Sequence, residues 1–199
     1  DKEITAITLQ FNDQIVAIGG QPYTPKQDNV KYIQCDNEAM LLMKFLDCWR
    51  AIDPDIVSGW NVEFFDIPYI VNRITRVMGK AETRRLCLMK KLPKERKFEQ
   101  YGREVVSYDL IGRVHLDYLN LYRKYNYEER HSYRLDYIGE MEIGEKKVPY
   151  EGSLDRLYNY DFVKFLEYNI QDVMLLAKMD KKLQFIDLAN IIAHENTIL

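Results

Sequence analysis

Two short motifs in the chain carry carboxylates of the kind that hold divalent metal ions. The first is an Asn-x-x-x-Phe-Asp pattern that begins at Asn61 and ends at Asp66. The second, about 100 residues later, is a Tyr-x-x-x-Asp pattern formed by Tyr168 and Asp172. Hydrolysis of a phosphodiester needs an activated water and stabilised charge on the leaving oxygen, which two divalent ions about 4 Å apart provide. Because hard cations bind carboxylate oxygens, the two motifs together indicate metal-dependent phosphodiester cleavage.

Each motif also has a simpler interpretation. Asp66 stands just before Pro68, where a helix is expected to begin, and an aspartate there can cap that helix. Tyr168 and Asp172 lie four residues apart and would share one helical face, but so short a pattern recurs by chance. In the functional interpretation Asp66 and Asp172 bind metal. The Tyr168 hydroxyl, neutral at pH 7, then hydrogen-bonds the attacking water.

Aromatic and amide side chains surround Asp66. Aromatic rings stack on unpaired bases in proteins that bind single strands, although such residues more often belong to a core. The candidate DNA-binding residues are Trp60, Asn61, Phe64 and Phe65.

The elements expected around these motifs alternate between strands and helices, which predicts a layered α/β domain. The first helix is expected to bury Ala39, Leu42, Leu46 and Trp49 on one face. The expected strands are 4–11, 14–18, 30–33, 56–60, 105–108 and 113–116. The expected helices begin at Asp36 or Asn37 (ending near 52), at 68 (ending near 79), at 119, at 133 and at 160, the last running to about 188. A loop is expected at 139–149.

A basic stretch lies in the middle of the chain. Between Arg84 and Arg103 there are eight Lys and Arg residues and two glutamates. The stretch is either a solvated surface loop, as charge runs usually are, or a loop that faces phosphate, and both interpretations stay open.

The overall composition argues against several classes of protein. The 199 residues are enough for one domain with a core, and 47% hydrophobic with 30% charged residues is an ordinary globular composition. No apolar run approaches the ~20 residues that span a membrane. The three cysteines are widely spaced, which argues for a reducing compartment and against a zinc site. A net charge of −3 argues against a protein that coats duplex DNA.

The sequence around both motifs resembles the proofreading exonuclease domain of family B DNA polymerases. Its second exonuclease motif is similar to the segment that contains Asn61 and Asp66, and its third to the segment that contains Tyr168 and Asp172. Two further segments resemble the same domain in polymerases of T-even-like phages. The resembling segments are 52–61, 65–70, 116–124, 147–152 and 168–176.

The resemblance implies a ribonuclease H-like fold, with a mixed central sheet flanked by helices in three layers. It implies 3′→5′ removal of mismatched nucleotides in DNA replication. By the same resemblance, Asp66 and Asp172 bind metal in a site for two Mg²⁺ or Mn²⁺ ions and Tyr168 positions the water. Asn61 and Phe65 would contact the single-stranded primer end.

The family's first motif, an Asp-x-Glu on the first central strand, has no convincing counterpart. Asp1 and Glu3 match its letters, but the run 4–11 that follows resembles the family's second strand. We therefore expect the true acidic pair to lie upstream of Asp1. Residues 1–199 would then form a single exonuclease domain, truncated at its N-terminus, cut before the polymerase palm and poorly active in isolation.

Other polar residues are expected to have structural roles. Asp117 ends an apolar strand, but the family segment that it resembles holds no metal ligand. His115, His131 and His194 lie in separate segments without metal-ligand spacing. Tyr168 occupies the place of the histidine found in another exonuclease type, so the resemblance implies the tyrosine type.

The same resemblance implies the partners of the domain. The range 94–112 falls where the family has a hairpin that helps to separate primer from template. The expected partners are the 3′ end of primer DNA, the remainder of the same polymerase chain and replisome clamp proteins, with no membrane. The expected location is the cytoplasm of a bacterial or phage-infected cell. Two alternatives stay open: a degenerate, non-catalytic domain that binds DNA or a partner protein, and a stand-alone exonuclease.

Overall fold

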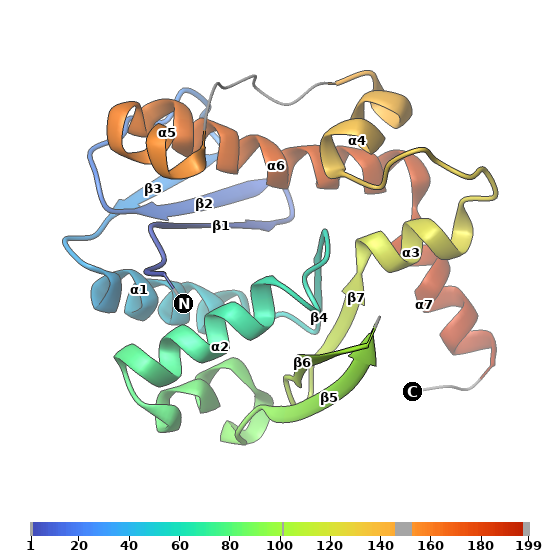
Figure 1. Ribbon diagram of the computed structural model, residues 1–199, viewed down its shortest axis with the longest axis horizontal. Coiled ribbons are helices and arrows are strands. Elements are labelled where there is room, and N and C mark those ends of the chain that lie inside the picture. The colour runs from blue at the N-terminus through green and yellow to red at the C-terminus, as the bar shows by residue number, and fades with distance from the viewer. Residues whose placement is uncertain (1, 101, 146–152, 197–199) are drawn as a thin grey trace.

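The computed structural model describes residues 2–100, 102–145 and 153–196. Helices lie on both sides of a small sheet, with α5 and α6 above it and α1 and α2 below it in the view of Figure 1. The expected α/β class is confirmed. The strands are β1 (Ala6–Phe11), β2 (Gln14–Gly19), β3 (Val30–Gln34), β4 (Ile56–Gly59), β5 (Lys94–Gln100), β6 (Arg103–Asp109) and β7 (Val114–Asp117).

The helices make up the outer layers. Short 3₁₀ helices follow α2, and the last three helices follow one another with almost no connecting residues. The helical elements are α1 (Glu38–Ile52), α2 (Asp66–Val77), η1 (Lys80–Leu86), η2 (Leu88–Lys90), α3 (Tyr118–Tyr125), α4 (Leu135–Ile143), α5 (Leu154–Tyr160), α6 (Phe162–Leu183) and α7 (Phe185–Glu195).

The largest sheet has the order β1-β2-β3 and is mixed, because β1 is antiparallel to β2 while β2 is parallel to β3. Alternate residues of β2 face opposite helical layers. Ile15 and Ala17 pack in the cluster that contains Leu166 of α6. Ile18 packs in the cluster that contains Leu42 of α1. This sheet is therefore buried on both faces.

The other strands form two separate pairs. β4 is parallel to β7, and β5 is antiparallel to β6. Within the described residues, β1 pairs only with β2 and β4 only with β7, so each has one unpaired edge. The strands thus make three small sheets in place of the single central sheet that was expected.

A buried ion pair ties α1 to α2. Glu38 and Arg73 are both buried, and the Arg73 Nε donates to Glu38 Oε1 at 2.8 Å. The backbone N–H of Ile4 donates to the same oxygen. α1 buries Leu42, Leu46 and Trp49 as expected, but Ala39 is exposed. The prediction for Ala39 is wrong because Glu38, paired with Arg73, takes the inward-facing position in the first turn.

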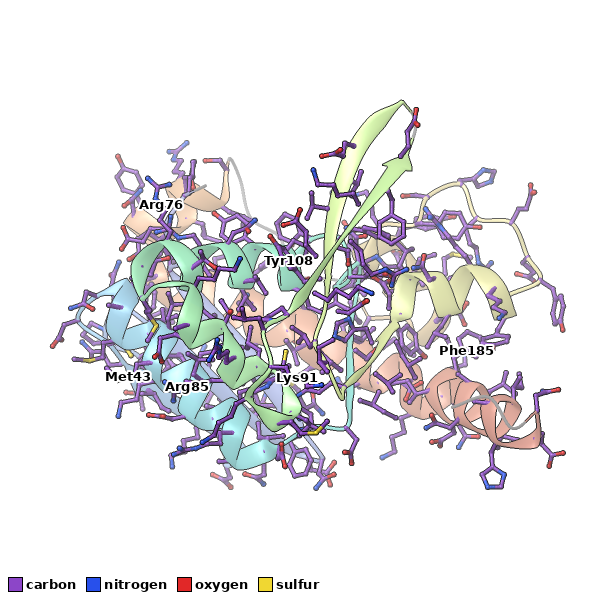
Figure 2. All side chains as sticks on the ribbon, turned by 90° about the horizontal axis from the view of Figure 1, so that it is seen from below. Met43, Arg76, Arg85, Lys91, Tyr108 and Phe185 are labelled. Carbon is purple, nitrogen blue, oxygen red and sulfur yellow. The ribbon has the colours of Figure 1, made fainter. Side chains whose placement is uncertain are left out.

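The basic stretch is ordered secondary structure. It includes the end of η1, then η2 and the strand β5, which forms a hairpin with β6 (Figure 2). The expectation of a loop was wrong for this stretch, because charged residues cover both faces of a strand that lies mostly in solvent.

Two helix predictions also need correction. The range 139–149 was expected to be a loop, but α4 continues through Gly139 to Ile143. A Cβ at Gly139 would lie 2.7 Å from the side chain of Leu175, so this glycine lets α4 approach α6 closely. The long helix expected from 160 to 188 breaks at Gln184, whose φ of 55° ends α6 and starts α7.

Some expectations fall on other parts of the chain. Asp1 and the segment 147–152 lie outside the described residues. Glu3 is exposed and precedes β1. The three cysteines are free thiols. Among the helices that the structure describes, none is long and apolar enough to cross a membrane.

Candidate active site

The first motif is a turn that connects β4 to α2. β4 ends at Gly59, and Asn61 adopts the left-handed conformation with a φ of 65°. The N–H of Phe65 donates to the carbonyl of Asn61 at 3.0 Å, and the N–H of Ile67 donates to the carbonyl of Val62 at 3.0 Å. The turn 60–65 therefore winds directly into the first turn of α2, which begins at Asp66.

Small residues allow this turn to close. A Cβ on Gly59 would lie 2.9 Å from the Cβ of Val62, closer than real Cβ contacts allow. Val62 is itself buried in the core. The Ser58 hydroxyl donates to the carbonyl of Leu116 at 2.7 Å, which adds a side-chain bond across the β4–β7 pair. Local packing and hydrogen bonding therefore explain why serine and glycine stand at positions 58 and 59.

Asp117, at the end of β7, binds the backbone of the same turn. Its Oδ1 accepts from the backbone N–H of Asn61 at 3.3 Å, and its Oδ2 accepts from that of Glu63 at 3.1 Å. Oδ1 also accepts from Leu119 at 3.0 Å and Asn120 at 3.4 Å, the first N–H groups of α3. Asp117 is 5% exposed. No pattern in the sequence indicates these contacts with the turn, because they reach backbone atoms more than fifty residues away.

Asp66 stands in the first turn of α2 and is not its N-cap. The N-cap is Phe65, which makes no side-chain capping bond. The capping interpretation of Asp66 is therefore wrong. A carboxylate at this end of a helix is stabilised by the helix dipole.

The surroundings of Asp66 raise the pKa of its carboxyl group above the usual value for an aspartate. The residue as a whole is exposed to solvent, yet many protein atoms lie around its carboxylate, and this partial desolvation raises its pKa to about 6. A hydrogen bond from its own backbone N–H opposes the rise, and the charge of Asp117 adds to it. A divalent cation would reverse the effects of burial and of Asp117, because it favours the charged carboxylate.

The aromatic residues of the turn have different surroundings. Phe65 is 61% exposed and stacks on Tyr69. Trp60 packs against Tyr118 and Tyr122, and its Nε1 donates to the carbonyl of Tyr133 at 3.1 Å. Trp60 is therefore partly buried among other rings, and Phe65 offers more free surface to a ligand.

Phe64 connects the turn to the β5–β6 hairpin. Its ring meets Phe98 of β5 edge to face, with the centroids 5.9 Å apart. The Tyr108 hydroxyl of β6 donates to Asn72 of α2 at 3.1 Å. Figure 2 shows Tyr108 beside α2 and the hairpin extending away from the body of the molecule. The hairpin thus contacts α2 near its base through Tyr108 and the motif turn closer to its tip through Phe98.

A polar pocket of about 300 Å³ lies between the hairpin base, β7 and the turn. Its lining includes Glu63, Asp109 and His115. Burial lowers the pKa of His115, and burial together with the charge of Asp117 raises the pKa of Glu63. Both groups are therefore shifted towards their neutral forms.

The second motif lies on α6. Tyr168 and Asp172 are half-buried and four residues apart on this helix. The helix is fixed against the sheet beside them, because the Thr8 hydroxyl of β1 donates to Asn169 and Ile170 is buried. The predicted helical setting of the motif is confirmed.

The two motifs approach the sheet from opposite layers. α2 carries Asp66 on one side of the β1–β3 sheet and α6 carries Asp172 on the other (Figure 1). The carboxylates of Asp66 and Asp172 are the kind of oxygen donor that Mg²⁺ and Mn²⁺ prefer. Over the ranges that the structure describes, His, Cys, Asp and Glu form no group of three or more that could hold a metal ion. The donor chemistry of the two carboxylates suits such ions, and the described residues do not by themselves complete a metal site.

The sequence of the chain is similar to those of known proteins. The sequence model of the DNA polymerase family B exonuclease domain matches residues 3–138. The DNA-directed DNA polymerase of Escherichia phage RB69 is 39% identical over 163 residues, which are 81% of this chain and 18% of that protein. The polymerase of Enterobacteria phage T4 is 34% identical over 161 residues, with the same coverage. The DNA polymerase delta catalytic subunit of Caenorhabditis elegans is 30% identical over 166 residues, 78% of this chain. The chain spans less than a fifth of the length of these relatives.

Proposed function

The chain belongs to the exonuclease domain family of family B DNA polymerases, and we propose that it is the 3′→5′ proofreading domain of such an enzyme. Its substrate is the 3′-terminal phosphodiester of single-stranded or frayed primer DNA. The observation that carries the proposal is the pairing of the family match with the turn 60–65, which presents Asp66 at the start of a helix. The proposed place of action is the cytoplasm of a bacterial or phage-infected cell.

The proposed fold is ribonuclease H-like, with residues 1–199 as one domain. The unpaired edges of β1 and β4 support this proposal, since one further strand between them would join the mixed sheet to the β4–β7 pair. That strand, with an Asp-x-Glu pair, is proposed to come from a segment upstream of Asp1. The polymerase palm is proposed to follow the domain.

Asp66 and Asp172 are the proposed metal ligands, completed by the upstream acidic pair. Mg²⁺ or Mn²⁺ held by these carboxylates would activate a water molecule and stabilise charge on the leaving oxygen. The Tyr168 hydroxyl, four residues from Asp172 on α6, orients that water by a hydrogen bond.

The proposed contacts to the primer end come from the turn. Phe65 supplies an exposed ring for stacking on the terminal base, and Asn61 supplies an amide. Trp60 and Phe64 border the same surface. The β5–β6 hairpin is proposed to separate primer from template. Further proposed partners are the remainder of the polymerase chain and replisome clamp proteins.

The test of this proposal is the exonuclease rate of the full-length protein that carries the domain. Asp172→Ala should reduce the rate by at least ~10³-fold, since it removes a metal ligand worth several kcal/mol. Tyr168→Phe should reduce it by only about tenfold, because one hydrogen bond to water is removed. Asp187→Ala, an exchange in the first turn of α7, is the matched control and should leave the rate unchanged. Normal digestion by Asp172→Ala would favour a degenerate domain that binds without cutting.

A further inference from the structure

Asp117 is a buried carboxylate whose hydrogen bonds reach two separate segments. Oδ1 accepts from Asn61, Leu119 and Asn120, while Oδ2 accepts from Glu63. Within the described ranges, no lysine or arginine forms an ion pair with it. Burying a carboxylate without a counter-charge is unfavourable unless backbone donors satisfy it.

Capping of α3 alone does not require this residue. A serine or threonine hydroxyl caps a helix about as well as an aspartate. What the carboxylate adds is its reach back to the turn 60–65, where it accepts from the N–H of Asn61, a residue in the left-handed conformation. Asparagine adopts left-handed backbone more readily than most residues, so the contribution of Asp117 is the pair of hydrogen bonds that it accepts from this turn.

The backbone of the turn fixes the position of Asp66 through hydrogen bonds to its neighbours. The carbonyls of Asn61 and Val62 accept the N–H groups of Phe65 and Ile67, the residues on either side of Asp66. A change in the backbone at Asn61 or Glu63 therefore moves the start of α2. No other side chain among the described residues accepts from the N–H groups of both Asn61 and Glu63.

We propose that Asp117 is a positioning residue of the exonuclease site, which holds the turn 60–65 so that Asp66 is presented in its metal-binding place. This inference rests on the proposed function. Asp117 does not touch the metal or the substrate; it acts through the backbone of the turn. Residues that orient a metal ligand without binding the metal are important for the site. Their removal typically lowers metal affinity or activity by about 10- to 100-fold.

Two substitutions separate the turn from the cap. Asp117→Ser keeps a good cap for α3, but its short hydroxyl does not reach Asn61 and Glu63. Asp117→Asn keeps the shape of the side chain. When its amide oxygen takes the place of Oδ1, its NH₂ group faces the N–H of Glu63, and two donors cannot form a hydrogen bond with each other. The matched control is Asp161→Asn, because Asp161 caps α6 by accepting from Lys164 and its bonds reach no second segment.

The experiment combines hydrogen exchange with metal titration in the full-length protein. In Asp117→Ser and Asp117→Asn, amide exchange across 60–66 should become about tenfold faster or more, while the start of α3 stays protected. The Mg²⁺ concentration for half-maximal primer cleavage should rise by about 10- to 100-fold, and high Mg²⁺ should restore part of the rate. Asp161→Asn should match the wild type in both measurements.

The possible outcomes are distinct. Unchanged exchange across 60–66 and an unchanged Mg²⁺ requirement in the Asp117 variants would overturn the inference, even if Asp172→Ala abolishes cleavage. A rate that falls equally at every Mg²⁺ concentration, with a lowered thermal midpoint, would also overturn it, since Asp117 would then only stabilise the fold. If Asp66→Asn and Asp172→Ala both cleave normally, the proposed function itself fails and the inference fails with it.

Discussion

Phe65 is the residue of the motif turn that offers the most open ring. It is 61% exposed and touches Tyr69, so its replacement leaves no cavity in the core. Phe65→Ala should raise the KM for a single-stranded primer end by about 5- to 150-fold, the equivalent of the ~1–3 kcal/mol that one base–aromatic stack contributes. Steady-state digestion of a short oligonucleotide measures this change.

The control for that experiment is Tyr127→Ala, which removes a fully exposed ring far from the turn in sequence. Its KM should equal that of the wild type. An unchanged KM for Phe65→Ala would show that the turn does not stack on the primer.

The letters of the two motifs single out the residues that we propose carry the chemistry. Asp66, Tyr168 and Asp172 stand out because carboxylates and a phenol recur at family spacing. The role of Asp117 could not be predicted, since its partners in the turn are backbone N–H groups distant in sequence. Trp60 could not be separated from Phe65 for a related reason: an aromatic ring suits both a core and a base-stacking surface, and only packing distinguishes them.

Among the secondary-structure elements, the Glu38–Arg73 pair decides how α1 meets α2. Burial would raise the pKa of Glu38, but the hydrogen bonds from Arg73 and from the Ile4 N–H outweigh it and hold this pKa below 4.5. Arg73→Met leaves the carboxylate buried without its cation and should lower the free energy of unfolding by about 3–5 kcal/mol at pH 7. Urea unfolding measures this change.

The pH dependence of that effect has a definite sign. A depressed pKa in the folded state stabilises the protein above pH 4.5, and this contribution is lost as the pH falls through the folded-state pKa. The stability difference between the wild type and Arg73→Met should therefore shrink below pH 4.5. Lys97→Met, which breaks the exposed pair with Glu104, is the control and should leave the free energy of unfolding nearly unchanged. An equal cost for both variants would contradict the structural role of the buried pair.

The strands and helices with an apolar face were predictable, and those without one were not. β1 alternates apolar and polar residues, β2 is a short continuous apolar run, and α1 repeats apolar residues at helical spacing. β5 has charges on both faces, because a hairpin that projects into solvent needs no buried face. The helix break at Gln184 was missed for a similar reason: α6 and α7 are both amphipathic, and one left-handed residue between them leaves little trace in sequence.

Across the whole molecule, charge is distributed unevenly despite the small net charge. Within the described residues, five exposed basic side chains from α2 to η2 form no ion pair, whereas Arg85 is paired with Asp47 and Glu82. Arg76, Arg85 and Lys91 all lie along the side where α2 and the 3₁₀ helices run (Figure 2). We call the unpaired set the basic surface; its members are Arg76, Lys80, Arg84, Lys90 and Lys91.

The basic surface should contribute to DNA binding through its attraction for phosphate groups. Replacing both Lys90 and Lys91 with Gln should reduce the slope of log K against log salt by about 0.9 for each duplex phosphate that these lysines neutralise. Fluorescence anisotropy over a range of salt concentrations measures the slope. A variant with Lys31→Gln and Lys181→Gln, two exposed lysines on β3 and α6, has the same charge change and should keep the wild-type slope. Equal slopes in all three proteins would mean that the basic surface is only solvated.

Digestion of a 5′-labelled primer by the full-length protein in Mg²⁺ decides whether the domain proofreads. The primer is annealed to a template with its last 3′ base mismatched, and the product lengths are followed on a gel. We predict shortening by one nucleotide at a time from the 3′ end, faster from the mismatched primer than from a paired one, and almost none with Asp66→Asn. Absence of shortening, or the same shortening with Asp66→Asn, would contradict the proposed function.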